Sequence, residues 1–300
     1  MGASLVELSG ELAAAVEAAA PSVVRVEGRR RSASSGVVWS ADGVIVASHH
    51  AVDAEDGVPV GLQDGRIVAA RVVGRDPGSD LAVLRAEAAG LAVPRWDDGP
   101  SPRVGHLVLG LSRPGRSARA RLGVVSAVAG EWRTPAGDRL ESYLETDIGP
   151  HPGFSGGLLL GAAGSAIGVT TAGLLRGAGM AVAAASLRRL VGALLARGRV
   201  RRGWLGIGTQ PVALGPELGA RLGQATALLV LSVQPGSPAA KAGLLLGDVL
   251  LRAREERLTG PAALLPALDE EGVGRELALR ILRAGEERDA TVVVGEREAS

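Results

Sequence analysis

A single serine stands between glycines in the segment HPGFSGGLLL, residues 151–160. The hydroxyl of Ser155 could attack a carbonyl carbon, or it could only supply the polar group of a tight turn. Attack on an amide at neutral pH needs a base within hydrogen-bonding distance, usually a histidine, and a third group that orients the base. A catalytic role for Ser155 therefore depends on the histidines and acids that the rest of the chain provides.

All four histidines of the chain precede this serine: His49, His50, His106 and His151. The segment GFSGG matches the GxSxG nucleophile elbow of esterases and lipases, but in that fold the histidine follows the serine. A serine and lysine dyad is also disfavoured, because the single lysine, Lys241, belongs to the C-terminal part of the chain. What remains is a triad in which a histidine and an aspartate both precede Ser155.

His50 is the strongest candidate for the base, because it follows the expected strand GVIVAS and would lie at the mouth of a barrel. Asp80 in GSDLAVLR stands at the head of the next long apolar strand and is the favoured orienting acid. Asp76 and Asp53 are the alternative acids. An isolated histidine or aspartate is most often a surface residue or a cap. Three such residues in order, each beside a strand end, favour a catalytic site.

Valine-rich segments of strand length, separated by glycine and aspartate, occupy residues 21–93 and again residues 103–185. A spacing of about ten residues with turn signals between is typical of an antiparallel barrel or sandwich. Two similar sets of six segments predict two small barrels. The period becomes helical over residues 186–198, and Gly198 suits the end of a helix. We therefore expect one domain over residues 21–198, closed by this helix.

Residues 1–20 are expected to form an amphipathic helix, because Leu5, Leu8, Leu12 and Val16 recur at helical spacing. The segment lacks the basic region of a secretory leader. No apolar run in the chain is long enough for a membrane span. A chain that is complete at its N-terminus would therefore be expected in the cytoplasm.

The composition limits the classes of function. The chain has 300 residues, no cysteine and a net charge of +1, and 46% of its residues are hydrophobic. This length predicts two or three globular domains. Disulfides and thiolate chemistry are excluded, and a near-neutral charge gives no attraction to nucleic acid. Neither a GxxxxGK[ST] loop nor an HExxH motif occurs, so we expect no cofactor and no metal.

Three motifs, in this order, resemble those of the HtrA (Deg) family of trypsin-like serine proteases: SGVVWSADGVIVASHHAV, GSDLAVLR and DIGPHPGFSGGLLL. The resemblance covers residues 20–295 and implies a chymotrypsin-like pair of six-stranded β-barrels with a triad in the cleft between them. It implies His50 as general base, Asp80 as orienting acid and Ser155 as nucleophile. The backbone N–H groups of Gly153 and Ser155 would form the oxyanion hole.

The chain departs from the family pattern at three positions. Phe154 and His151 stand where the family commonly has asparagine, and so does His49. Phe154 still provides a backbone, but its ring must find a pocket or bias the loop, so constitutive activity depends on this residue. On a strand the adjacent His49 and His50 would point to opposite faces, which leaves only one of them to face the serine.

The segment SAIGVTTA resembles the strand that lines the primary specificity pocket in trypsin-like folds. Val169 and Thr170 would then line the pocket, and Gly149 would leave its base without a carboxylate. Such a pocket predicts cleavage after small or medium aliphatic residues, such as Val, Ala or Leu. The substrates would be unfolded or extended chains that add a strand to the cleft.

The last third of the chain, residues 203–296, resembles the PDZ domain attached to HtrA proteases, a small α+β fold. The motif RGWLGI resembles its carboxylate-binding loop. Five residues of this motif would bind a C-terminal peptide: Gly203, Trp204, Leu205, Gly206 and Ile207. Residues 260–271, expected to be helical, would form the other wall of the groove.

The resemblance as a whole implies a mainly β protein that cleaves unfolded proteins without ATP, in protein quality control and the stress response. Its PDZ domain would bind C-terminal peptides, and the Leu and Val face of the first helix would hold a homotrimer. The family's location implies a periplasmic or extracytoplasmic protein. Two other interpretations stay open: a degenerate protease that acts as a chaperone or peptide-binding scaffold, and an all-β binding protein without chemistry.

Overall fold

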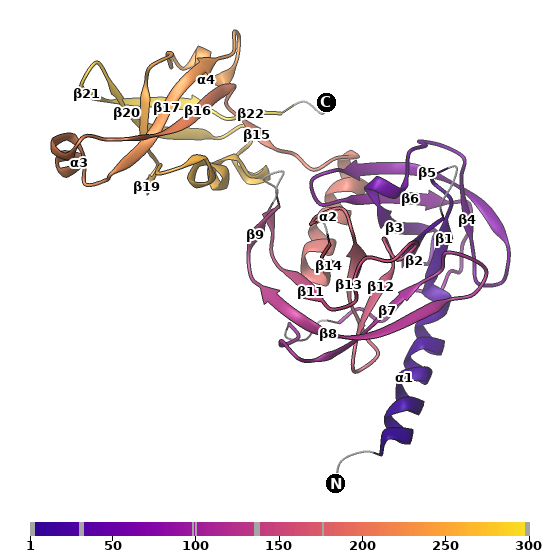
Figure 1. The fold of residues 1–300 in the computed structure, drawn as a ribbon. Helices are drawn as coiled ribbons and strands as arrows, with labels where there is room; N and C mark the ends of the chain where they lie inside the picture. The colour runs from indigo at the N-terminus through magenta and orange to yellow at the C-terminus, as the bar shows by residue number, and fades with distance from the viewer. Residues whose placement is uncertain are drawn as a thin grey trace. The chain divides into compact units, whose positions relative to one another are not determined.

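The structure is a computed structural model and describes residues 4–29, 33–97, 99, 101–134, 139–175 and 177–297. The chain divides into two compact units, Met1–Val200 and Arg201–Ser300. The first unit carries one N-terminal helix and two closed barrels, and the second is built on one main sheet (Figure 1).

Six antiparallel strands close the first barrel in the order β1-β2-β3-β6-β5-β4 (Figure 1). Their bounds are β1 Val23–Val26, β2 Ser34–Ser40, β3 Val44–Ser48, β4 Val58–Gly61, β5 Ile67–Asp76 and β6 Leu81–Ala86. Valine and isoleucine fit the pleated, buried surface of a sheet, and every residue of β3 is buried. The prediction of a first six-stranded barrel is confirmed.

The second barrel closes in the order β11-β14-β13-β12-β7-β8. Its strands are β7 Leu107–Ser112, β8 Arg119–Ala129, β11 Tyr143–Thr146, β12 Leu158–Gly161, β13 Ala166–Thr171 and β14 Gly179–Ala183. This barrel too was predicted. A short hairpin of β9 (Trp132–Arg133) and β10 (Arg139–Leu140) was not. Its Trp132 ring lies 4.7 Å from the ring of Tyr143, a contact that ties the hairpin to β11.

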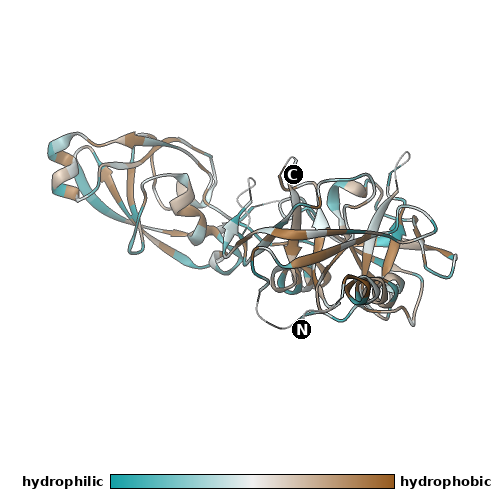
Figure 2. Cartoon of the chain, turned by 60° about the horizontal axis from the view of Figure 1, so that its bottom comes forward, coloured by the Kyte–Doolittle hydropathy of each residue, from teal (hydrophilic) through white to brown (hydrophobic). Residues whose placement is uncertain are grey.

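One cluster of buried side chains runs through both barrels and α2 (Ala184–Arg197). Val37 of the first barrel, Leu158 of the second and Leu187 of α2 are all completely buried. Burial of such a side chain contributes roughly 1.5–3 kcal/mol, so the barrels and α2 form one body. The barrel strands are hydrophobic over much of their length (Figure 2). Gly198 ends α2 with φ 73°, as the sequence predicts.

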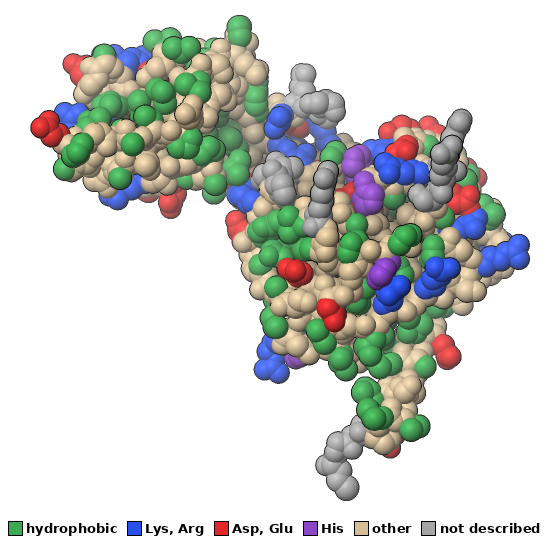
Figure 3. Space-filling model, viewed as in Figure 1, with side chains coloured by type: hydrophobic (Ala, Val, Ile, Leu, Met, Phe, Trp, Pro, Cys, Tyr) green, Lys and Arg blue, Asp and Glu red, His purple; other side chains and the backbone are tan. Residues whose placement is uncertain are grey.

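The N-terminal helix α1 (Leu5–Ala19) presents two different surfaces. Leu12 and Val16 pack against the core, as their spacing predicts, whereas Leu5 and Val6 are 85% and 81% exposed. Apolar side chains are visible along this helix in Figure 3. In the part of the chain that the structure describes, no helix combines the length and the apolar character needed to cross a bilayer.

The second unit contains a sheet with the order β16-β17-β18-β20-β21, and β19 pairs with β18. Its elements are β15 Gly203–Trp204, β16 Ile207–Ala213, α3 Pro216–Leu222, β17 Thr226–Val233, α4 Pro238–Lys241, β18 Val249–Ala253, β19 Glu256–Arg257, β20 Glu276–Arg283, β21 Glu286–Val293 and β22 Gly295–Glu296. Leu228, Leu250 and Leu277 are completely buried in a core that belongs to this unit alone.

Two helical segments of this unit differ from the sequence prediction. Residues 260–271, expected to be one helix, form two segments of 3-10 helix, η3 (Pro261–Leu268) and η4 (Glu270–Gly272). Pro266 lies inside η3 and lacks the N–H group that an α-helix needs, which explains the difference. The short helix α3 was missed, because the glycine in PELGARL is a weak helix former.

Candidate active site

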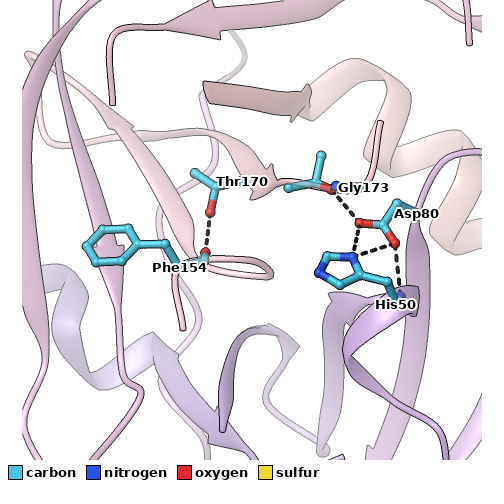
Figure 4. Close-up of polar contacts among 6 residues, drawn as sticks. His50, Asp80, Phe154, Thr170 and Gly173 are labelled. Atoms are coloured by element: carbon cyan, nitrogen blue, oxygen red, sulfur yellow. Dashed lines mark hydrogen bonds and ion pairs between the residues drawn. The ribbon is translucent and has the colours of Figure 1, made fainter. Parts of the chain in front are cut away.

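His50 and Asp80 come from two turns of the first barrel, the 3-10 turn η2 (His49–Ala51) after β3 and the turn between β5 and β6. The His50 Nδ1 atom lies 3.0 Å from Asp80 Oδ1 and 2.8 Å from Oδ2 (Figure 4). The His50 backbone N–H donates to Oδ1 at 2.9 Å. Asp80 is 3% exposed. With Nδ1 at the carboxylate, the Nε2 atom of His50 is left to accept a proton.

The two histidines are arranged differently from the strand expectation. Because η2 is a 3-10 turn, the argument that neighbouring side chains point to opposite faces of a strand does not apply. The His49 N–H donates to the Asp80 carbonyl at 2.9 Å. The His49 Nδ1 atom is buried and has no hydrogen-bond partner in the described chain. Burial lowers the pKa of His49 and outweighs the negative charge of Asp80, which by itself would raise it.

Two residues that the sequence did not single out complete the surroundings of Asp80. The Thr171 hydroxyl donates to Asp80 Oδ2, and the Gly173 N–H donates to Thr171 Oγ1 at 2.9 Å. Burial alone would raise the pKa of Asp80, but hydrogen bonds from His50 and Thr171 outweigh it and lower the pKa below its usual value. The signal in the sequence is the pair of threonines that ends the otherwise apolar segment SAIGVTTA.

The alternative acids have other partners. Asp76 is completely buried and accepts a hydrogen bond from the Ser79 N–H at 3.1 Å. Asp53 forms an ion pair with Arg29 at 3.2 Å. Asp80 is thus the candidate acid whose carboxylate lies against the His50 ring.

Ser155 lies in the loop between β11 and β12, directly after a tight turn. The Phe154 N–H donates to the carbonyl three residues earlier at 3.0 Å, and Gly153 inside this turn has φ 82°. Gly156 has φ 78°, and a Cβ there would come within 2.1 Å of the Ser35 carbonyl oxygen. Glycine is required at both positions, because other residues rarely adopt this backbone conformation.

The backbone N–H groups of Gly153 and Ser155 make no hydrogen bond within the described residues. Across the same residues, no hydrogen bond joins the Ser155 hydroxyl to His50. Such bonds are often long in enzymes without substrate and tighten when substrate binds.

The side chain of Phe154 is buried, since the residue is only 6% exposed. It lies 5.9 Å from the His151 ring, edge to face, and the Arg121 guanidinium lies 5.6 Å above it. The Phe154 carbonyl accepts a hydrogen bond from the Thr170 hydroxyl at 2.6 Å (Figure 4). It also accepts one from the Gly157 N–H at 2.9 Å. The bulky ring is therefore accommodated without leaving the backbone of the loop unsupported.

A pocket of about 20 Å³ lies beside Ser155. Its lining residues are Thr146, Ile148, Gly149, Pro150, His151, Phe154, Ser155, Thr170, Thr171, Ala172, Gly179 and Met180. Gly149 and Thr170, two of the residues predicted for the specificity pocket, line it, whereas Val169 does not. Val169 is 1% exposed and packs in the core shared by the barrels. Neighbouring strand residues point to opposite faces, so only one of Val169 and Thr170 can face the pocket.

The five residues predicted to bind a peptide lie at one edge of the second unit. Gly203 and Trp204 form β15, which pairs with β22. Leu205 is 2% exposed, and Gly206 has φ 77°. Ile207 begins β16, which pairs only with β17 among the described strands and contacts η3. β16 is therefore an edge strand of the sheet that the described residues form.

Domain comparisons agree with this architecture. Residues 34–169 match the trypsin-like peptidase domain, and residues 203–294 match the PDZ domain. The chain is thus a trypsin-like peptidase domain followed by a PDZ domain.

Whole-chain comparisons narrow this class. The HtrA-type protease AlgW, solved with a tripeptide, is 31% identical with a TM-score of 0.76, over 96% of this chain and 98% of that chain. The serine endoprotease from Yersinia pestis is 29% identical with a TM-score of 0.77, over 99% and 100% of the two chains. The chain belongs to the HtrA-type protease family.

Curated relatives point the same way. The probable periplasmic serine endoprotease DegP-like of Halomonas elongata is 33% identical over 275 residues, which cover 89% of this chain and 57% of the relative. The protein of the same name from Chlamydia trachomatis is 33% identical over 266 residues, 87% of this chain and 53% of the relative. The chain therefore spans about half the length of these curated relatives.

Proposed function

We propose that the chain is a serine endopeptidase that acts through His50, Asp80 and Ser155. The observation that carries this proposal is the 2.8 Å contact between His50 Nδ1 and Asp80 Oδ2. Asp80 orients the imidazole, and His50 takes the hydroxyl proton as Ser155 Oγ bonds to the substrate carbonyl carbon. His50 then gives this proton to the leaving amine, and water hydrolyses the acyl-enzyme by the same route.

The negative oxygen of the tetrahedral intermediate would bind to the N–H groups of Gly153 and Ser155. Support for this role comes from the absence of any competing acceptor for these two groups within the described residues. One such donor typically lowers the barrier by about 3–4 kcal/mol, because it is already aimed at the charge that develops.

The pocket beside Ser155 favours small aliphatic side chains at the position before the cut. None of its lining residues is acidic, and Ile148, Phe154 and Met180 give it an apolar wall. The pocket is small, with a volume of about 20 Å³. Alanine and valine are therefore expected to fit best, leucine requires the pocket to widen, and arginine would bury an unpaired charge.

The second unit would bind the C-terminus of an extended peptide. The open edge of β16 offers backbone hydrogen bonds, and the loop of Leu205 and Gly206 before it offers N–H groups to a terminal carboxylate. The related protease AlgW has been solved with a tripeptide and with a decapeptide. The combined protein would act without ATP on unfolded chains that expose such segments.

Cleavage of unfolded casein tests the catalytic assignment. The wild-type chain should cleave it, Ser155→Ala should lose at least about a thousandfold in rate, and His106→Asn, which changes an exposed histidine, should match wild type. Equal cleavage by wild type and Ser155→Ala would contradict the assignment. If neither protein cleaves and both suppress aggregation, the chaperone interpretation is correct.

Peptides with valine or alanine before the cut should also react faster than the matched arginine peptide.

A further inference from the structure

Ser35 makes three hydrogen bonds around the loop that carries Ser155. It lies on β2 in the first barrel and is completely buried. Its backbone N–H donates to the Ser155 carbonyl at 3.1 Å, and its hydroxyl donates to the Gly153 carbonyl at 2.7 Å. The same hydroxyl oxygen accepts the Arg113 backbone N–H at 2.8 Å. One residue of the first barrel thus binds both residues whose N–H groups would form the oxyanion hole.

We propose that Ser35 is a positioning residue for this oxyanion hole, which rests on the function proposed above. The Gly153–Phe154 peptide unit lies between the two donor N–H groups, and its carbonyl is the one bound by the Ser35 hydroxyl. Gly153 has φ 82°, and glycine turns about its backbone bonds more freely than other residues. Because a peptide unit is planar, holding its carbonyl fixes the direction of the whole unit.

The opposite side of the loop is held from the second barrel. The Phe154 carbonyl accepts the Thr170 hydroxyl, which fixes the peptide unit that carries the Ser155 N–H. Without the Ser35 hydroxyl, the unit between the donors would be held only by the Phe154 N–H. The two N–H groups would then point toward one oxygen atom for less of the time. This would reduce the stabilisation of the tetrahedral intermediate more than that of the bound substrate.

Arg113 fixes the direction of the Ser35 hydroxyl. Its side chain is anchored at 2.6 Å to the Val23 carbonyl and at 2.8 Å to the Ala20 carbonyl, and the residue is 3% exposed. The backbone N–H of this anchored residue occupies a lone pair of the Ser35 oxygen. The hydroxyl proton is therefore directed to the remaining acceptor, the Gly153 carbonyl.

Ser34 provides a matched control on the same strand. It is 7% exposed, and its hydroxyl has no hydrogen-bond partner in the described chain. Ser34→Ala and Ser35→Ala remove the same atom from adjacent buried positions, but only the second variant breaks the bond to Gly153. A difference between the variants therefore reports on the two hydrogen bonds of the Ser35 hydroxyl, to the Gly153 carbonyl and from the Arg113 N–H, and not on the loss of a buried hydroxyl in general.

The test compares full-length wild type, Ser34→Ala, Ser35→Ala and Ser155→Ala on a peptide with valine before the cut. Two ligands are added: a peptide aldehyde, which forms a tetrahedral adduct with the serine, and the acid product peptide, which does not. For Ser35→Ala we expect kcat to fall about 10- to 100-fold, less than the loss of a whole donor, with KM within about twofold. Aldehyde affinity should fall with kcat, whereas affinity for the product peptide should not change.

The outcomes separate the two proposals. If Ser155→Ala is inactive while Ser35→Ala matches Ser34→Ala in kcat, the role of Ser35 is wrong and the proposed function stands. If Ser35→Ala lowers the affinity for the product peptide as much as the affinity for the aldehyde, the substitution disrupts the whole binding site. This outcome also overturns the positioning role. If Ser155→Ala keeps the wild-type rate, the proposed function fails, and the inference about Ser35 fails with it. Circular dichroism melting shows whether both serine variants are folded.

Discussion

Neighbouring residues of the same type have different environments in the first barrel. The His50 ring is hydrogen-bonded to Asp80, whereas the buried Nδ1 atom of His49 has no hydrogen-bond partner among the described residues. A buried ring nitrogen without a partner favours the neutral imidazole, because a charge there would lose its hydration. The two histidines are therefore suited to different tasks, and only His50 has the contacts of an oriented base.

The lowered pKa of His49 makes the stability of the first unit depend on pH. Its pKa is lower in the folded chain than in the unfolded chain, so below about pH 6.5, the ordinary value, the unfolded state binds the proton better. Stability should therefore be lost as pH falls from about 7 to 5. His49→Asn should show a flatter dependence in thermal melts over this range, and His106→Asn, at an exposed site, should follow wild type. Parallel curves for His49→Asn and wild type would contradict the prediction.

The elements contribute to function mainly through the turns that join them. The strands bury their side chains, while η2, the β5–β6 turn and the β11–β12 loop carry the candidate triad. In the second unit, the loop before β16 likewise carries the residues proposed to bind a peptide carboxylate. A Cβ on Gly206 would lie 2.3 Å from the Ser237 Cβ, so this loop is packed closely against the turn that begins α4.

Gly206→Ala should weaken peptide binding by the second unit about tenfold or more. The added methyl group meets Ser237, and φ 77° disfavours any side chain, so the proposed carboxylate-binding N–H groups would shift. Gly236→Ala is the matched control, because Gly236 has φ 73° but open space around it. Fluorescence anisotropy with a labelled peptide ending in valine measures the effect. An equal loss in both variants would mean that backbone strain, and not the shape of the loop, is responsible.

On the scale of the whole molecule, each unit has its own core. The first unit is held together by a cluster shared between its barrels and α2, and the second by a separate cluster under its sheet. Among the residues that the structure describes, large apolar side chains are more than 80% exposed only on α1, at Leu5 and Val6. Such exposure on a helix is costly in water, and the sequence prediction of a homotrimer through this helix stays a prediction.

Sedimentation equilibrium tests that assembly directly. A trimer has three times the chain mass of 30.3 kDa, and the double variant Leu5→Glu, Val6→Glu should shift it toward monomer, because charges would be buried at the contact. Leu122→Glu, a change at a residue that is 54% exposed on the second barrel, serves as the control. A wild-type chain that sediments as a monomer at micromolar concentration would contradict the prediction.

The two barrels and the order of the candidate triad follow from the sequence alone. Short valine-rich segments separated by turn residues specify strands, because valine packs well on the buried face of a sheet and the turn residues end each strand. The absence of any histidine after Ser155 excluded the esterase arrangement. The glycines on both sides of that serine also indicate a tight turn, because a sharp turn favours residues without a side chain.

The polar side chains that contact the candidate site are identified by the packing of the two barrels. Thr171 is 91 positions from Asp80, and Ser35 is 118 positions from Gly153. No local pattern encodes such contacts, because they depend on how the two barrels pack. The position of Val169 in the core has the same origin, since a shift of one residue in a strand exchanges one face of the sheet for the other. The local pattern therefore specified the elements, and their packing specified which side chains meet.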